Sequence, residues 1–161
     1  MHILIAEDDT VTRRMLQKTL EQWGHEVVAT DSGTEAWKAF QKNNFRLLIT
    51  DWVMPGLDGL ELCQKARAYA GELGRPVYVI LLTSRGSVQD LAAGLNAGAD
   101  DFIAKPFSQD ELHARVHSGE RIVSLQQQLI GAREEMERLA LTDSLTNLFN
   151  RRALIETMRK D

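Results

Sequence analysis

The sequence predicts an α/β fold in which helices cover both faces of a five-stranded parallel sheet of order 2-1-3-4-5. Over the first 120 residues, short apolar runs alternate with segments whose apolar residues recur at helical spacing. This alternation is typical of repeated strand–helix units. The runs at 47–49 and 78–82 are apolar throughout, as expected of strands that helices cover on both sides.

Local signals divide these 120 residues into elements. Serines at 32 and 108 are each followed three residues later by a glutamate, the spacing of a capping box at a helix start. Gly24 and Gly98 are expected to end the helices that precede them. The five expected strands lie at residues 2–6, 26–30, 46–50, 77–82 and 101–104.

Composition limits the class of protein. The chain has 161 residues, of which 43% are hydrophobic, and a net charge of −4, which argues against a nucleic acid or a membrane surface as the main partner. It contains no apolar run of membrane-spanning length. A single cysteine, Cys63, suits a reducing cytoplasm and is expected in the core. His113 and His117 have helical spacing, but without a third ligand nearby we expect them to be surface residues.

Charged and hydroxyl side chains follow four of the expected strands. They are Glu7 and Asp8, Asp51, Thr83 and Lys105. The carboxyl ends of parallel strands meet at one edge of the sheet, and in this strand order the crevice opens between the first and third strands. Clustered carboxylates repel one another unless a cation such as Mg²⁺ binds between them. The sequence therefore predicts a magnesium site at this edge.

The same side chains could carry out phosphoryl transfer. Asp51 could attack a phosphoryl group and form an aspartyl phosphate, Thr83 could donate its hydroxyl to a phosphoryl oxygen, and Lys105 could supply a second cation. Taken singly, a residue of each of these types more often belongs to a turn, caps a helix or carries a solvated charge. Their presence on the correct strands in the correct order makes the combination far more specific.

The last helix continues past residue 120 with apolar residues at alternating spacings of three and four. They are Ile122, Leu125, Leu129, Ala132, Met136 and Leu139. This is the spacing of a coiled-coil seam over about three heptads. Almost all the residues between them are polar, so we expect a homodimer through this helix. The alternative is a single amphipathic helix that folds back on the domain.

The first 120 residues resemble the receiver domain of bacterial response regulators, which has the flavodoxin-like doubly wound fold. The matching segments are residues 3–9, 51–59, 82–84 and 98–107. The resemblance implies that Asp51 is the phosphoacceptor and that Glu7 and Asp8 form the acidic pair. It also implies that the backbone carbonyl of Val53 is a further Mg²⁺ ligand.

By the same resemblance, Thr83 and Phe102 form a switch pair. The hydroxyl moves toward the phosphate, and the aromatic ring turns into the space that it leaves. The peptide bond between Lys105 and Pro106 is expected to be cis. The resemblance further implies a histidine kinase or a phosphotransfer protein as the phosphoryl donor.

Residues 141–152 resemble the opening of diguanylate cyclase (GGDEF) domains, whose pattern is Asp-x-Leu-Thr-Gly-Leu-x-Asn-Arg-Arg. Asn147 stands where glycine is usual. About twenty residues cannot form a nucleotide-binding domain. We therefore expect a receiver domain at 1–120, a coiled-coil helix at 121–141 and the truncated start of a cyclase domain at 142–161. The alternative reading of residues 141–152 is an ordinary helix start.

The expected function is a phosphorylation-controlled input module that is not itself an enzyme beyond its own phosphoryl transfer and hydrolysis. Through the dimeric helix it would control the synthesis of cyclic di-GMP. One alternative is an aspartyl-phosphate phosphatase of the haloacid dehalogenase type, although such enzymes need an aspartate at the position of Val53. Another is a constitutive dimerisation module whose acidic pocket is unused.

Overall fold

The computed structural model describes residues 1–84 and 86–158, with side chains through residue 141. The chain divides into two compact units, Met1–Ser124 and Leu125–Asp161. Among the described residues, no helix is long and apolar enough to cross a membrane.

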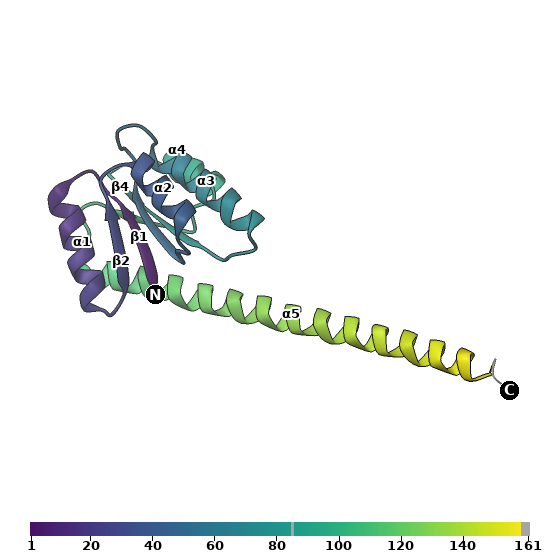
Figure 1. The fold of residues 1–161 in the computed structure, drawn as a ribbon. Coiled ribbons are helices and arrows are strands. Elements are labelled where there is room, and N and C mark those ends of the chain that lie inside the picture. Colours follow the sequence, from purple (N-terminus) through teal and green to yellow (C-terminus); the bar gives the residue numbers. More distant parts are fainter. Residues whose placement is uncertain (85, 159–161) are drawn as a thin grey trace. The chain divides into compact units, whose positions relative to one another are not determined.

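The first unit contains one parallel sheet of order β2-β1-β3-β4-β5, which confirms the predicted topology (Figure 1). Its strands are β1 (His2–Ala6), β2 (Glu26–Thr30), β3 (Leu47–Asp51), β4 (Tyr78–Thr83) and β5 (Asp101–Ala104). The bounds of β3 and β4 lie one residue later than predicted. Consequently Asp51 and Thr83 are the last residues of their strands, where both were expected to follow them.

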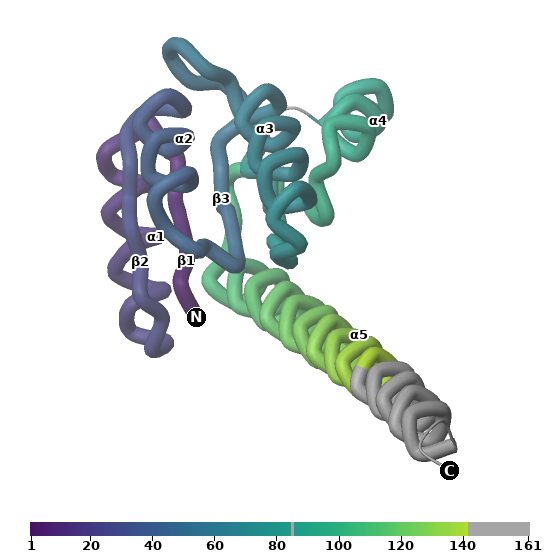
Figure 2. The backbone as a smooth tube through the Cα atoms, turned by 45° about the vertical axis from the view of Figure 1, so that its right-hand side comes forward, coloured from purple at the N-terminus to yellow at the C-terminus, as the bar shows by residue number. Residues whose placement is uncertain are grey.

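Helices cover both faces of this sheet. They are α1 (Thr10–Gln22), α2 (Gly33–Lys42), α3 (Gly59–Glu72), α4 (Val88–Asn96) and α5 (Gln109–Met158). Figure 2 shows α2 and α3 on the face opposite α1. Alternate strand residues therefore enter two cores, as Leu4 does with α2 and α3 and as Ile5 does with α1 and the start of α5. Cys63 is fully buried in the first of these cores, as predicted.

The helix ends agree with the sequence signals in part. Gly24 and Gly98 follow α1 and α4 with φ of 89° and 98°, a region that favours glycine. Ser32 accepts a bond from the amide of Glu35 at 3.2 Å, but the Glu35 carboxylate accepts from a lysine instead of closing the capping box. A complete capping box occurs at the start of α3, between Asp58 and Glu61.

The last helix, α5, includes the whole segment 121–141 for which a coiled coil is predicted and continues beyond it to Met158. The backbone of residues 142–158 is thus helical. The side chains of the segment resembling a cyclase domain, apart from Leu141, lie outside the part that the structure describes.

The turn between α1 and β2 places His25 against α5. The His25 side chain is 7% exposed, and its Nδ1 lies 3.7 Å from Oε1 of Glu120. Burial lowers the pKa of His25, although the carboxylate of Glu120 opposes the shift. The imidazole is therefore harder to protonate in the folded chain than in the unfolded one.

We expect the free energy of unfolding to fall as the pH is lowered from about 6.5, the ordinary pKa of histidine. Below that pH the unfolded chain takes up a proton that folded His25 resists, so the stability from neutral His25 is lost as the pH falls through its depressed pKa. Urea unfolding at pH 5.5 and pH 7.5 would measure the difference. In His25→Gln the difference should shrink, and an equal difference in both proteins would contradict this assignment.

Candidate functional site

The carboxyl ends of β1, β3, β4 and β5 bring the predicted side chains to one edge of the sheet. Glu7 and Asp8 follow β1, and Asp51 ends the neighbouring strand β3. Thr83 ends β4, and Lys105 follows β5 directly. The parallel register requires this convergence, since each of these strands points the same way.

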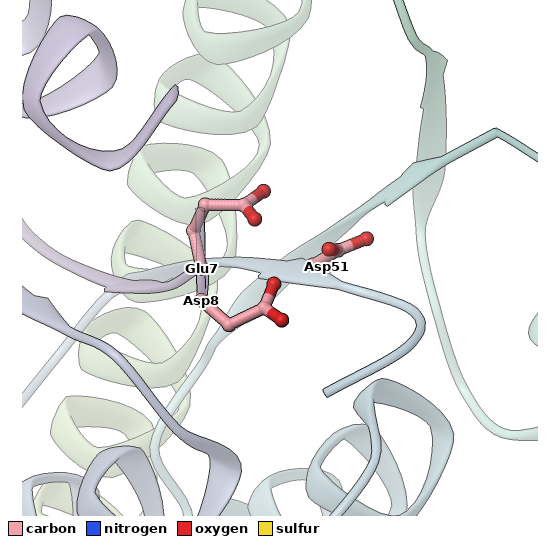
Figure 3. A group of neighbouring side chains, drawn as sticks. All are labelled: Glu7, Asp8 and Asp51. Carbon is pink, nitrogen blue, oxygen red and sulfur yellow. The ribbon is translucent and has the colours of Figure 1, made fainter. Parts of the chain in front are cut away.

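Three carboxylates form the centre of the site (Figure 3). One oxygen from each of Glu7, Asp8 and Asp51 lies within 4.8 Å of the others. Within the described part of the chain this is the only group of three potential metal ligands so close together. Glu7 is buried, Asp51 is half-buried and Asp8 is exposed. The group is thus open to solvent on one side, as suits Mg²⁺, which retains several water ligands.

Lys105 supplies the positive charge of the site. Its Nζ lies 2.8 Å from Oε2 of Glu7 and 3.1 Å from Oδ2 of Asp51. The Lys105–Pro106 bond is cis, as predicted. Burial alone would lower the pKa of Lys105, but the bonds to Glu7 and Asp51 outweigh it and raise the pKa. The ammonium is therefore charged and bridges two of the three carboxylates.

Glu7 is the buried carboxyl group of the site. Burial raises the pKa of Glu7 to about 7, and the proximity of Asp51 adds to the shift. The bonds from Lys105 and from the amide of Asp9 oppose it. A cation beside Glu7 favours its ionised form, and one oxygen from each of the three carboxylates lies within 4.8 Å of the others, so the three residues fit a divalent metal bound by oxygen ligands.

The backbone around Asp51 fixes the orientation of its carboxylate. Its Oδ1 accepts a bond from the Trp52 amide at 2.8 Å, which leaves Oδ2 facing Lys105. The Trp52 carbonyl accepts a bond from the amide of Gly59 at 2.8 Å. The first residue of α3 is thereby held against the end of β3.

Sequence reasoning assigned no role to two glycines beside this site. A Cβ on Gly59 would lie 2.1 Å from the carbonyl oxygen of Asp51, and a Cβ on Gly33 would lie 1.9 Å from that of Leu57. Both residues start helices that press against the loop connecting β3 to α3. Only the packed structure shows this proximity, because a glycine in a first helical turn has no distinctive local signal.

The predicted switch residues lie on adjacent strands. Thr83 is 2% exposed, whereas Phe102 is half-buried and packs against the core. A Cβ on Gly94 would lie 2.5 Å from the Phe102 ring, so this ring rests directly on the backbone of α4. Any movement of the Phe102 ring would therefore change its contact with α4.

Val53 lies in the loop that follows β3. Its side chain is 56% exposed. This position two residues after Asp51 agrees with the predicted role of its carbonyl, which stays a prediction. A phosphatase of the haloacid dehalogenase type needs an aspartate as general acid at this position, and the side chain of valine has no proton to transfer.

Comparisons with known proteins agree with this geometry. Residues 3–117 match the response regulator receiver domain model. The chain is 40% identical over 116 residues to the protein named "Probable transcriptional regulator ycf27" of Cyanophora paradoxa, covering 72% of this chain and 46% of that protein. It is 38% identical over 118 residues to the response regulator MprA of Mycobacterium leprae, covering 73% and 50% respectively.

Among solved structures, the receiver domain of the Francisella response regulator 1452 superposes with a TM-score of 0.66 at 31% identity. This similarity covers 74% of the present chain and 96% of that one. The chain spans about half the length of the curated relatives named above. Fold, site and matched residues together lead to one conclusion: the chain belongs to the response regulator receiver domain family.

Proposed function

We propose that the first unit accepts a phosphoryl group on Asp51 from a phosphohistidine of a histidine kinase or a phosphotransfer protein. The observation that supports this most is the position of Lys105, whose ammonium lies within 3.1 Å of both Asp51 and Glu7. A nucleophilic carboxylate, a cation and two further acids thus surround one point at the sheet edge. Membership of the receiver family supports the same partner and the same chemistry.

The chain's own residues divide the work of the transfer. Oδ2 of Asp51 forms the new bond to phosphorus as the bond between phosphorus and the donor imidazole breaks, while the Trp52 amide keeps the carboxylate oriented. Lys105 and the hydroxyl of Thr83 bind phosphoryl oxygens. Glu7, Asp8, Asp51 and the Val53 carbonyl would hold Mg²⁺, which supplies positive charge to those oxygens.

The direct test is incubation of the chain with acetyl phosphate and Mg²⁺, followed by intact mass measurement. Addition of one phosphoryl group, abolished by EDTA, is the expected result. Trp52 is 4% exposed and adjoins Asp51, so its fluorescence should report Mg²⁺ and beryllofluoride binding. A chain that binds neither would instead support the reading as a constitutive scaffold.

Val53→Asn is expected to shorten the lifetime of the aspartyl phosphate. The side chain is exposed two residues after Asp51, and an amide can hydrogen-bond a water molecule where valine cannot. The decay of the phosphorylated chain after removal of acetyl phosphate measures the effect. Val53→Leu, which stays apolar, is the matched control, and equal half-lives in the Asn variant and the wild type would reject this role.

The signal would leave through Phe102 and α4. Movement of Thr83 toward a phosphoryl oxygen would free space beside the Phe102 ring, which rests on Gly94. A change in the ring would then alter the surface formed by α4, β5 and α5. Beryllofluoride-dependent changes in hydrogen exchange at α4 would support this route.

We also propose that the chain forms a homodimer through the apolar residues at coiled-coil spacing in the second unit. In the single chain, Leu125, Leu129, Met136 and Leu139 are between 50% and 72% exposed. Apolar residues at coiled-coil spacing and with this exposure are buried most simply by a second copy of the helix. Sedimentation of the wild type and of Asp51→Asn, each with Mg²⁺ and with or without beryllofluoride, tests both the dimer and its coupling to Asp51.

The output that we propose is a diguanylate cyclase, on the grounds of residues 141–152. The relative ycf27 is named a probable transcriptional regulator, so a DNA-binding output is the competing proposal. Conversion of GTP to cyclic di-GMP by a longer protein containing this chain would support the cyclase. Sequence-specific DNA binding by that protein would support the other output.

A further inference from the structure

Arg13 of α1 reaches back to the turn that carries the two acidic residues after β1. Its Nη1 donates a hydrogen bond to the carbonyl of Glu7 at 2.8 Å and another to the carbonyl of Asp8 at 3.2 Å. Glu7 and Asp8 provide two of the three carboxylates of the acidic group, and both extend toward Asp51 (Figure 3). One guanidinium is thus bonded to the backbone of both residues.

Helix geometry explains why Arg13 can make these bonds. Asp9 caps α1 by accepting a hydrogen bond from the amide of Thr12, and the backbone amide of Arg13 donates to the carbonyl of Asp9 at 2.9 Å. Arg13 therefore closes the first turn of the helix. Side chains of a helix tilt toward its N-terminus, so a long side chain at this position extends back over the residues that precede the helix.

Asp8 depends on Arg13 more than Glu7 does. The carboxylate of Glu7 is buried and accepts hydrogen bonds from the Asp9 amide at 3.0 Å and from Lys105 at 2.8 Å. Asp8 is exposed, and within the described part of the chain the bond from Arg13 is the only side-chain hydrogen bond that it makes. Arg13 thus fixes the member of the acidic group that has the fewest other contacts.

The turn has to keep its conformation against electrostatic repulsion. One oxygen from each of Glu7, Asp8 and Asp51 lies within 4.8 Å of the others, and carboxylates so close together repel one another. Lys105 forms ion pairs with Glu7 and Asp51, which offsets the charge of these two acids. A turn that is already held in place loses less conformational freedom when an ion binds, so the affinity for that ion is higher.

We propose that Arg13 is a positioning residue of the magnesium site, which holds the turn at Glu7 and Asp8 in the conformation that presents both carboxylates to the ion. This role rests on the proposed Mg²⁺-dependent phosphorylation of Asp51. Position and charge have opposite effects here. Loss of a nearby cation strengthens Mg²⁺ binding if charge alone matters, whereas loss of the two hydrogen bonds of Arg13 weakens it.

The test is titration of the full chain with Mg²⁺, followed by Trp52 fluorescence. Arg13→Met keeps the apolar stem of the side chain and removes its donors, so the affinity for Mg²⁺ should fall about tenfold. Arg13→Lys keeps a charged donor, and its affinity should lie between those of Arg13→Met and the wild type. Saturating Mg²⁺ should return phosphorylation of Arg13→Met by acetyl phosphate to nearly the wild-type rate, since Asp51 and Lys105 are unchanged.

Arg14→Met is the matched control. Arg14 is the next residue of α1, is exposed, and makes no side-chain hydrogen bond or ion pair with the described residues, so this variant removes the same charge without disturbing the turn. Its affinity for Mg²⁺ should stay within about twofold of the wild type. In EDTA, hydrogen exchange of a peptide containing residues 7–9 should be faster in Arg13→Met than in Arg14→Met, which measures the turn without any metal.

An affinity of Arg13→Met for Mg²⁺ that equals or exceeds that of the wild type would overturn the role of Arg13. If the wild type were still phosphorylated on Asp51, the proposed function would stand without this residue. An equal loss of affinity in Arg13→Met and Arg14→Met would also overturn the role, because the loss would not come from the bonds of Arg13. A wild-type chain that neither binds Mg²⁺ nor accepts a phosphoryl group would overturn the role and the proposed function together. Arg13→Lys, the milder change, gives the same test if Arg13→Met fails to fold.

Discussion

Asp51→Asn is expected to abolish phosphorylation of the chain by acetyl phosphate. The amide keeps the shape of the carboxylate, and its oxygen can still accept the 2.8 Å bond from the Trp52 amide. It lacks, however, the negative Oδ2 that faces Lys105 and would attack phosphorus. The fold should therefore persist while the chemistry is lost. Intact mass measurement in the presence of Mg²⁺ shows the outcome directly.

Asp31→Asn is the matched control for this substitution. Asp31 also follows a strand of the sheet, but it is exposed and belongs to neither the acidic group nor the bonds of Lys105. Its phosphorylation should match that of the wild type. One phosphoryl group per chain in Asp51→Asn, at the wild-type rate, would show that another residue is the acceptor. Circular dichroism of both variants would separate a chemical loss from unfolding.

The parts of the fold that follow from local chemistry could be predicted from the sequence. Strand order follows from five apolar runs joined by helices, and the convergence of Glu7, Asp51 and Lys105 follows from the parallel direction of the strands. The glycine helix ends follow from backbone conformation alone. These features depend on residue type and on order along the chain, and the sequence itself contains both.

Features that depend on packing between distant segments could not be predicted. Arg67 of α3 donates hydrogen bonds to the carbonyl of Val77, which precedes β4. It also donates to the carbonyl of Gly98 and to the carboxylate of Asp100, which both follow α4. An isolated arginine on a helix gives no sign of such partners. The Glu120 contact with His25 escaped prediction for the same reason, since 95 residues separate the two in sequence.

The close packing at the first residues of α2 and α3, Gly33 and Gly59, could not be predicted from the sequence either. The loop between β3 and α3 carries Val53, and its path is confined by Gly33 and Gly59. Neither glycine has a positive φ, so conformational freedom does not explain the residue type. The absence of a side chain is what matters, because neighbouring carbonyl oxygens occupy the space where a Cβ would stand.

Gly59→Ala is accordingly expected to destabilise the first unit and to weaken Mg²⁺ binding. The new Cβ would lie 2.1 Å from the carbonyl oxygen of Asp51 and 2.9 Å from Cα of Trp52, and these backbone atoms cannot rotate away. Overpacking of this kind costs about 3 kcal/mol of unfolding free energy. Relief of the clash must shift α3 away from β3, which displaces the loop that carries Val53. Urea unfolding and Mg²⁺ titration by Trp52 fluorescence measure the two effects.

Gly71→Ala places the same substitution near the other end of the same helix. Nothing lies within 4 Å of a Cβ at Gly71, and its backbone is helical and exposed. Alanine has the higher helix propensity, so this variant should gain up to about 1 kcal/mol and keep the Mg²⁺ affinity of the wild type. Opposite signs for the two variants would attribute the loss at Gly59 to its contact with Asp51. A Gly59→Ala chain as stable as the wild type, with unchanged Mg²⁺ affinity, would show that α3 and β3 can separate without disturbing the site.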